Sequence, residues 1–274
     1  MPTASPIFRG RKLLIGMVHA GALPGTPFSR LPVAELARRA AAEAALLADV
    51  GFDAIIVENM HDRPYVHQRH GPETVAVMTV IASAVREAVG ADMSLGIQIL
   101  SGGNREALAV ALAADLQFIR CENFVFSHVA DEGLLAQAEA GPLLRYRREI
   151  GAEHVQVLCD IKKKHASHAI TSDVTVAEAA EAAQFFGADG VIVTGIATGK
   201  PTDPADLAAV RAATRLPVLV GSGVTPGNLH AVVGEADALI VGSFIKRGGR
   251  WENPVDPTRA KDLVREFRTL ARRK

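Results

Sequence analysis

Short, nearly continuous apolar runs alternate with longer amphipathic stretches along most of the chain. Runs of this kind are typical of parallel strands that helices cover on both faces, because neither face of the strand meets water. Turn-forming or charged residues bound most of the runs and separate eight predicted strands. These strands are Leu13–His19, Ala54–Glu58, Met93–Ile99, Gln117–Cys121, Val155–Ile161, Gly190–Thr194, Val218–Val220 and Ala238–Val241.

The stretches between the runs carry apolar residues at helical spacing and predict eight helices. Two of them begin with caps: Thr175 has Glu178 in the capping-box position, and Asp203 precedes Pro204. Segment 122–139 is long for a connection and predicts extra turns or a short helix. The helices are predicted over 32–49, 72–89, 105–113, 142–150 and 175–187, and from about 203, 225 and 256 onward.

Eight strand–helix units in 274 residues predict a single α/β domain, 1–274, folded as a (β/α)8 TIM barrel of the phosphate-binding type. An open doubly wound sheet is the main alternative. Eight regular units with no domain break favour closure of the sheet into a barrel.

Composition narrows the classes of partner. Thirty basic and 30 acidic residues give no net charge, which argues against nucleic acid or an anionic membrane as the partner. Cys121 and Cys159 form no CxxC pair and suit a reducing cytoplasm. The basic residues before Leu13 superficially resemble the start of a signal peptide, but the apolar run that follows is needed as the first strand. No apolar run is long enough for a transmembrane helix.

The last two predicted strands both end in Gly-Ser and predict a phosphate site. Glycines allow backbone N–H groups to approach an anion, and in (β/α)8 barrels the loops after strands seven and eight commonly bind phosphate. The alternative is that these glycines only relieve crowding at the barrel rim. Gly199 and Lys200, after the sixth strand, could help to hold the anion. The predicted phosphate ligands are Gly221, Ser222, Gly223, Thr225, Gly242 and Ser243.

Asp160 and Lys162 alternate along the fifth strand, so both side chains are expected on the same side. An Asp beside a Lys is a workable acid–base couple, and each would keep the other charged. Lys162 could instead act as a Schiff-base nucleophile. The alternative without function is a solvated loop over 162–164, with Asp160 as a structural cap.

Glu58 and Glu122 each end an apolar strand, and each is followed by an asparagine. These carboxylates are predicted to act as general bases, to bind substrate hydroxyls, or to hold a divalent cation with Asp160. The alternative is that neighbouring basic side chains satisfy them. No zinc-type ligand spacing is visible, and no cofactor is predicted. His19 completes the catalytic candidates, and the predicted substrate-binding residues are Asn59, Gln98, Asn123 and Thr194.

Several pieces of the chain, in order, resemble the BtpA family, which includes SgcQ-like proteins. They are Ile15-Gly16-Met17-Val18-His19, Val57-Glu58-Asn59-Met60-His61-Asp62, Gly96-Ile97-Gln98, Arg120-Cys121-Glu122, Asp160-Ile161-Lys162-Lys163-Lys164-His165 and Gly221-Ser222-Gly223-Val224-Thr225. The resemblance implies a phosphate-binding (β/α)8 barrel. One departure is His61, where the family pattern has an aromatic residue such as Phe.

Three functions follow for testing. The first is an enzyme that isomerises, epimerises or cleaves a small phosphorylated metabolite, such as a sugar phosphate or nucleotide-like compound, by acid–base chemistry. The second, implied by the family's name, is an assembly factor for a membrane complex such as a photosystem. The third is a phosphohydrolase. The expected partner is a small phosphorylated molecule, and a homo-oligomer is left open.

Overall fold

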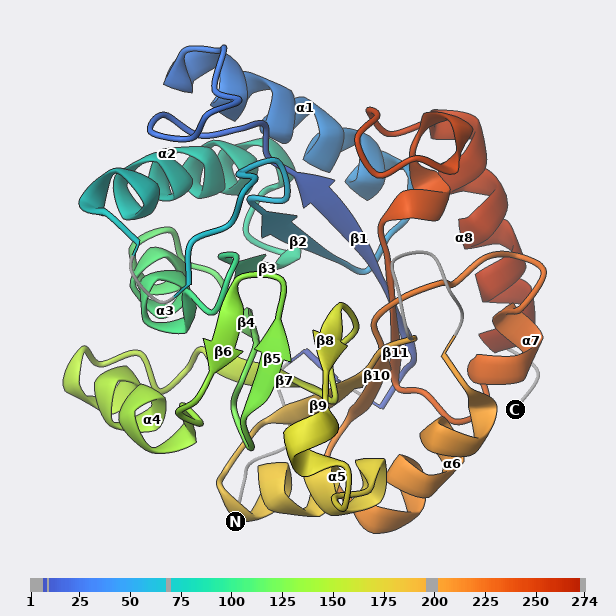
Figure 1. The fold of residues 1–274 in the computed structure, drawn as a ribbon. Helices are drawn as coiled ribbons and strands as arrows, with labels where there is room; N and C mark the ends of the chain where they lie inside the picture. The colour runs from blue at the N-terminus through green and yellow to red at the C-terminus, as the bar shows by residue number, and fades with distance from the viewer. Residues whose placement is uncertain (1–6, 9, 68–69, 196–201, 272–274) are drawn as a thin grey trace.

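Eight parallel strands close into a barrel in the computed structural model, which describes residues 7–8, 10–67, 70–195 and 202–271 (Figure 1). Their order around the barrel is β1-β11-β10-β9-β7-β4-β3-β2. The predicted (β/α)8 barrel is therefore confirmed. The strands are β1 (Leu13–His19), β2 (Ala54–Glu58), β3 (Ser94–Gln98), β4 (Phe118–Cys121), β7 (Gln156–Ile161), β9 (Gly190–Val193), β10 (Val218–Val220) and β11 (Ala238–Val241).

A helix follows each barrel strand and covers its outer face (Figure 1). The predicted capping box is present, because the Thr175 hydroxyl accepts a hydrogen bond from the Glu178 amide and Glu178 bonds back to the Thr175 amide. Asp203 caps α6 by accepting from Ala205 N at 2.8 Å. The helices are α1 (Val33–Val50), α2 (Pro72–Val89), α3 (Asn104–Ala113), α4 (Ala140–Glu149), α5 (Val176–Phe185), α6 (Pro204–Ala213), α7 (Leu229–Val232) and α8 (Pro257–Ala271).

Apolar side chains fill the barrel interior below the C-terminal ends of the strands, including the first residues of β1, β2 and β11. Ile56, Phe118 and Leu158 belong to this inner cluster, and a second apolar cluster lies between the strands and the helices. Gly96 makes room for the Phe118 ring, since a Cβ at residue 96 would lie 2.3 Å from it. The packed floor leaves the C-terminal ends of the strands as the place where the interior opens.

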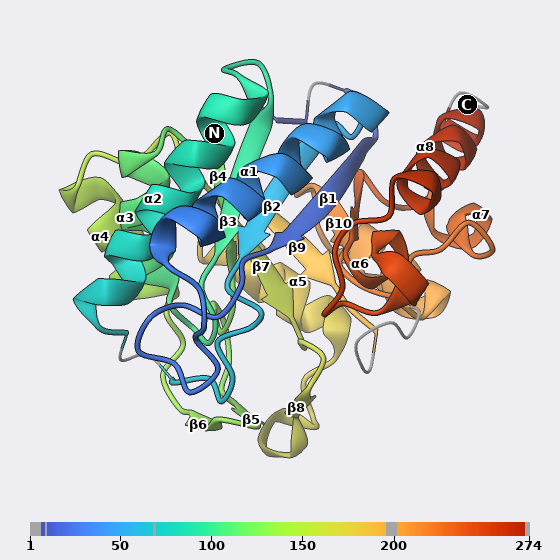
Figure 2. The same ribbon diagram turned by 90° about the horizontal axis from the view of Figure 1, so that it is seen from above.

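The long segment after β4 forms a hairpin rather than the expected extra turns or short helix. Strands β5 (His128–Ala130) and β6 (Gly133–Leu135) pair antiparallel, and β8 (Ala166–Ser167) joins them from the loop after β7. Gly133 has φ of 116°, which lets the chain reverse tightly between the two strands. Figure 2 shows this small sheet at one end of the barrel, on the side where the loop after β1 also lies.

The helix expected from about Thr225 begins later, at Leu229. Asn228 holds the preceding turn closed: its Oδ1 accepts from Thr225 N at 2.8 Å, and its Nδ2 donates to Gly223 O at 2.8 Å. Gly227 lies inside this turn and disfavours an earlier helical start, because glycine is a poor helix former. Any anion near β10 would therefore meet loop N–H groups and not the N-terminus of a long helix.

Candidate active site

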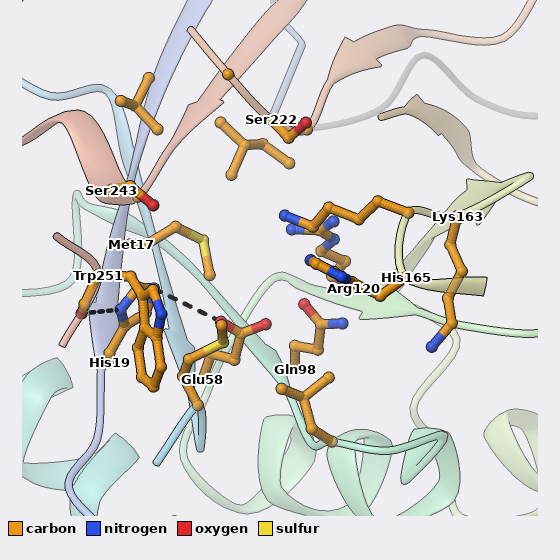
Figure 3. A pocket seen from close by; sticks show the side chains of 18 of the residues that line it. Met17, His19, Glu58, Gln98, Arg120, Lys163, His165, Ser222, Ser243 and Trp251 are labelled. Carbon is orange, nitrogen blue, oxygen red and sulfur yellow. Dashed lines mark hydrogen bonds and ion pairs between the residues drawn. The ribbon is translucent and has the colours of Figure 1, made fainter. Parts of the chain in front are cut away.

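One cavity of about 510 Å³ opens at the C-terminal ends of the barrel strands (Figure 3). All six predicted phosphate ligands, from Gly221 to Ser243, line it. The same cavity is lined by five residues predicted for chemistry or substrate binding, namely His19, Glu58, Gln98, Glu122 and Asp160. The structure thus brings together two groups of residues that lie far apart in the sequence.

The loops after β10 and β11 form one side of the cavity. The amide N–H groups of Gly223 and Ser243 have no hydrogen-bond acceptor within the described part of the chain. Gly221 also relieves crowding, since a Cβ there would lie 2.5 Å from Ile192, whereas a Cβ at Gly242 would have 3.4 Å to its nearest neighbour. Packing therefore explains the first glycine, and the open donors at Gly223 and Ser243 suit an anion.

Arg259 brings a positive charge to this side of the cavity from α8. Its Nε donates to Phe244 O at 2.6 Å, and its guanidinium lies over the Phe244 ring at 4.3 Å from the centroid. A guanidinium fixed in this way is a suitable ligand for a phosphate group. No local pattern in the sequence indicated Arg259, because the last helix is far from β10 in the chain.

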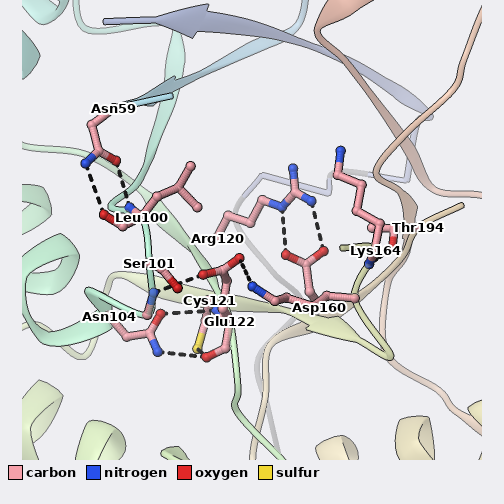
Figure 4. Close-up of polar contacts among 12 residues, drawn as sticks. Asn59, Leu100, Ser101, Asn104, Arg120, Cys121, Glu122, Asp160, Lys164 and Thr194 are labelled. Carbon is pink, nitrogen blue, oxygen red and sulfur yellow. Dashed lines mark hydrogen bonds and ion pairs between the residues drawn. The ribbon is translucent and has the colours of Figure 1, made fainter. Parts of the chain in front are cut away.

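Asp160 pairs with Arg120, not with Lys162 as predicted. Arg120 Nε donates to Asp160 Oδ2 at 2.9 Å, and Nη2 donates to Oδ1 at 3.0 Å (Figure 4). The strand ends at Ile161, and Lys162 has φ of 43°, so the alternation of side chains breaks there. Lys162 Nζ donates to Thr171 O at 3.1 Å and does not line the cavity. The prediction that Asp160 and Lys162 face the same side is therefore wrong.

Lys164 takes the place in the cavity that was expected for Lys162. Its amide donates to Thr194 Oγ1 at 2.9 Å, which fixes the loop after β7. Within the described ranges its Nζ has no hydrogen-bond or ion-pair partner. Burial and the Arg120 charge lower the pKa of Lys164 to about 8. An appreciable share of this amine is thus neutral near pH 7.

Glu122 is held by Lys163. Lys163 Nζ donates to Glu122 Oε1 at 2.9 Å, and Gly102 N donates to Oε2 at 2.9 Å. Burial raises the pKa of Glu122, but the Lys163 charge and these hydrogen bonds outweigh burial and lower it overall. Glu122 is therefore an ionised, fixed carboxylate, which agrees with the alternative of a carboxylate satisfied by a basic neighbour.

His19 and Glu58 form a pair on adjacent strands. His19 Nε2 lies 3.6 Å from Glu58 Oε2, and His19 Nδ1 lies 3.0 Å from Trp251 O (Figure 3). A carbonyl only accepts, so Nδ1 carries the proton of neutral His19 and Nε2 keeps a free lone pair. Burial raises the pKa of Glu58 and lowers that of His19 well below its ordinary value. Both groups are thus driven toward their neutral forms, and the free lone pair of His19 Nε2 lies 3.6 Å from Glu58 Oε2.

Of the four residues predicted to bind substrate, only Gln98 lines the cavity. Its Oε1 is buried and has no partner among the described residues. Asn59 is occupied elsewhere, since its Nδ2 donates to Asp62 at 2.9 Å and its Oδ1 accepts from Leu100 N at 2.7 Å. Asn123 Nδ2 donates to Gln137 O at 2.6 Å, and Thr194 holds the Lys164 amide. These three placements contradict a lining role, because each side chain closes a loop instead.

The suggested help of Gly199 and Lys200 in holding the anion stays a prediction, because both residues lie outside the described part of the chain. In the described part of the chain, no group of three or more His, Cys, Asp and Glu side chains is placed to hold a metal ion.

Trp251 is an unpredicted aromatic wall of the cavity. Its ring packs against His61 at a centroid distance of 5.0 Å, and the Arg63 guanidinium lies 4.9 Å from the Trp251 centroid. His61, the departure from the family pattern, thus supports Trp251 from behind and does not itself line the cavity.

Fold and cavity together define a (β/α)8-barrel protein whose polar groups gather at the C-terminal ends of the strands. The chain belongs to the BtpA family, whose model matches residues 10–269.

Two relatives match nearly the whole chain. An uncharacterised mitochondrial protein of Caenorhabditis elegans is 44% identical over 96% of this chain and 95% of its own length. The photosystem I biogenesis protein BtpA of Synechocystis is 35% identical over 94% of this chain and 88% of its own length. Among solved structures, 3-hexulose-6-phosphate synthase is similar with a TM-score of 0.56, 19% identity and coverage of 94% of this chain and 99% of that one. No helix among the described residues is long and apolar enough to cross a membrane.

Proposed function

We propose that this protein is an enzyme that binds a small phosphorylated metabolite, such as a sugar phosphate or nucleotide-like compound, and moves protons on it. One observation carries the proposal: a single cavity brings together open N–H donors, the guanidinium of Arg259 and the titratable groups His19, Glu58 and Lys164. The phosphate would lie on the loops that contain Gly223 and Ser243. That anchor would position the rest of the substrate against the titratable side chains, and positioning of this kind lowers the barrier to reaction.

The proton chemistry falls to His19, Glu58 and Lys164. Glu58 keeps a proton at a higher pH than an ordinary carboxyl, so it would serve as a general acid that donates to the substrate, and the free lone pair of His19 Nε2 would accept a proton from the substrate. A base of this kind contributes roughly 10²–10⁴-fold to a rate. Asp160 and Glu122 would have positioning roles instead of transferring protons. Asp160 orients the Arg120 guanidinium, and Glu122 accepts a hydrogen bond from Lys163. Isomerisation, epimerisation and aldol cleavage each need a proton acceptor, and a fixed phosphate would position the substrate against it.

The proposal is tested by measuring the melting temperature of the protein with matched pairs of compounds. Ribose 5-phosphate and fructose 6-phosphate are compared with ribose and fructose, and inorganic phosphate serves as a third ligand. A ligand that binds the folded state raises the melting temperature as its concentration exceeds Kd. The proposal expects a rise with phosphorylated compounds only. An equal response to both members of each pair would contradict it.

The name of the Synechocystis relative supports a second candidate, a factor that assists the assembly of a membrane complex. Phe185 and Phe186 would be its contact point, because they are 84% and 53% exposed and their rings pack edge-to-face with centroids 5.3 Å apart. A pull-down in which Phe185→Ser loses a membrane partner would favour this candidate. A phosphohydrolase is the third candidate, and a metal-free native protein with full activity would exclude a metal-dependent version of it. The absence of a cofactor and a cytoplasmic location stay predictions; the two cysteines are buried and unpaired, which suits a reducing compartment.

A further inference from the structure

We propose that Lys164 Nζ is a covalent nucleophile that forms an imine with the carbonyl group of the substrate. The inference rests on the proposed function and narrows its substrate class to phosphorylated aldehydes and ketones. It also assigns the catalytic amine to a residue that was not among the catalytic candidates in the sequence.

Three successive lysines have three different environments, and only the third is open to a ligand. Lys162 Nζ donates to Thr171 O outside the cavity, and Lys163 Nζ is bonded to Glu122. Lys164 lines the cavity, and its Nζ has no partner among the side chains and carbonyls that the structure describes. Because the amine lines the cavity and no described residue bonds to it, it is open to a ligand.

The charges around Lys164 favour the neutral amine, which is the nucleophilic form. Two acids that act on Lys164 are Glu58, whose own burial favours its neutral form, and Asp160, which already has both oxygens bonded to Arg120. Arg120 therefore acts on Lys164 as a second cation, and its charge and burial both disfavour the ammonium form. Thr194 fixes the backbone of Lys164 at 2.9 Å, which holds the amine at the cavity wall.

The covalent step balances without an oxidant or reductant. The nitrogen lone pair of Lys164 forms a bond to the carbonyl carbon, the carbonyl π electrons move to oxygen, and the oxygen takes one of the two amine protons. The C–O bond then breaks as the oxygen takes the second amine proton, and it leaves as water while the nitrogen lone pair forms the C=N bond. A further proton from an acid in the cavity makes the imine cationic. The iminium accepts the electron pair when a neighbouring C–H or C–C bond breaks, and water later releases the product by the reverse steps.

The test uses pyridoxal 5′-phosphate, an aldehyde that carries a phosphate, and pyridoxal, the same aldehyde without it. The whole protein is incubated with each probe and reduced with borohydride, and the modified lysine is identified by peptide mass spectrometry. We expect pyridoxal 5′-phosphate to modify Lys164 at least about tenfold faster than pyridoxal does, which corresponds to about 1.4 kcal/mol. Lys164→Arg should lose the modification, and the matched variant Lys162→Arg should keep it.

The outcomes separate this inference from the proposed function. Modification of Lys163 or of surface lysines, with Lys164 unmodified, would overturn the role of Lys164, whether or not phosphorylated compounds raise the melting temperature. Equal rates at Lys164 with both probes would support the nucleophile and contradict the phosphate anchor. A Lys164→Arg variant with an unchanged melting temperature shows that its lost reactivity is not a loss of fold.

Discussion

Arg120 and Asp160 form a two-pronged ion pair across β4 and β7, with the Nε–Oδ2 distance at 2.9 Å and the Nη2–Oδ1 distance at 3.0 Å. Both residues are 6% exposed, and both line the cavity. Both Asp160 oxygens are thus taken by Arg120, and the Arg120 charge is the one that acts on the neighbouring Lys164 amine as a second cation.

The first prediction concerns this pair. Arg120→Met or Asp160→Leu alone should cost about 3–5 kcal/mol of unfolding free energy, because each leaves a buried charge without its partner. The double variant should lose less than either single variant, since no charge is left buried. Urea denaturation measures all three. If the double variant lost the sum of the two single effects, the pair would not be coupled in the way the distances indicate.

The second prediction concerns His19. Burial lowers the pKa of His19 well below 6.5, so its imidazole should stay neutral, with the proton on Nδ1, from pH 8 to pH 6. Nitrogen-15 NMR of the ring nitrogens reads the tautomer directly, and the urea-unfolded protein, in which histidines titrate near 6.5, is the reference. An imidazolium at pH 7 would show instead that Glu58 is ionised and paired with it. Because the unfolded chain binds a proton that folded His19 rejects, His19 should lower stability as the pH falls below about 6.5.

The third prediction is that Lys164 lowers the stability of the folded protein. Its pKa is about 8 in the folded protein against an ordinary value of 10.5, because burial disfavours the ammonium form. At pH 7 the amine is mostly protonated, so this form destabilises the folded state relative to the unfolded chain. Lys164→Met should gain about 1–3 kcal/mol at pH 7, a range reduced from the full shift because the side chain is only half-buried. The penalty is complete below pH 8 and fades as the pH rises toward 10.5. The advantage of Lys164→Met should therefore shrink between pH 7 and pH 10, and a constant advantage would point to packing alone.

The fourth prediction tests whether Arg259 supplies a positive charge to the phosphate-binding side of the cavity. Arg259→Gln should weaken the binding of a phosphorylated compound by about tenfold or more, because charge-assisted hydrogen bonds to phosphate are the strong ones. Arg250→Gln is the matched control, since Arg250 has a 72% exposed side chain and pairs with Glu252 at 3.7 Å. Isothermal titration calorimetry measures both variants. Equal affinities would remove Arg259 from the site.

The eight strand–helix units and the lining role of both Gly-Ser loops could be predicted, because burial on both faces and glycine turns leave local patterns in the sequence. The pairing of Asp160 could not. Side chains alternate between the two faces only within a strand. The strand ends at Ile161, and the positive φ of Lys162 turns the chain, so the alternation does not extend to the Lys162 side chain. The sequence did contain a signal for Arg120, because it is a charged residue inside the apolar run of β4. A prediction that considers only the last residues of the strands misses it.

Other residues had no local trace at all. Asn59 and Asn123 follow strand-end carboxylates, as cavity residues often do, yet each closes a loop, and only the three-dimensional partners of their amides reveal this. Trp251 and Arg259 reach the cavity from the end of the chain. Their place depends on how the last units close the barrel against β1, which no spacing in the sequence records.

The most direct test of the phosphate anchor compares Ser243→Asp with Ser243→Asn. The two side chains have nearly the same size, but only the aspartate places a negative charge beside the open N–H groups of the β10 and β11 loops. With ribose 5-phosphate as ligand, Ser243→Asn should keep a rise in melting temperature and Ser243→Asp should show none, because like charges repel at short range. An equal rise in the two variants would contradict a phosphate site at Ser243.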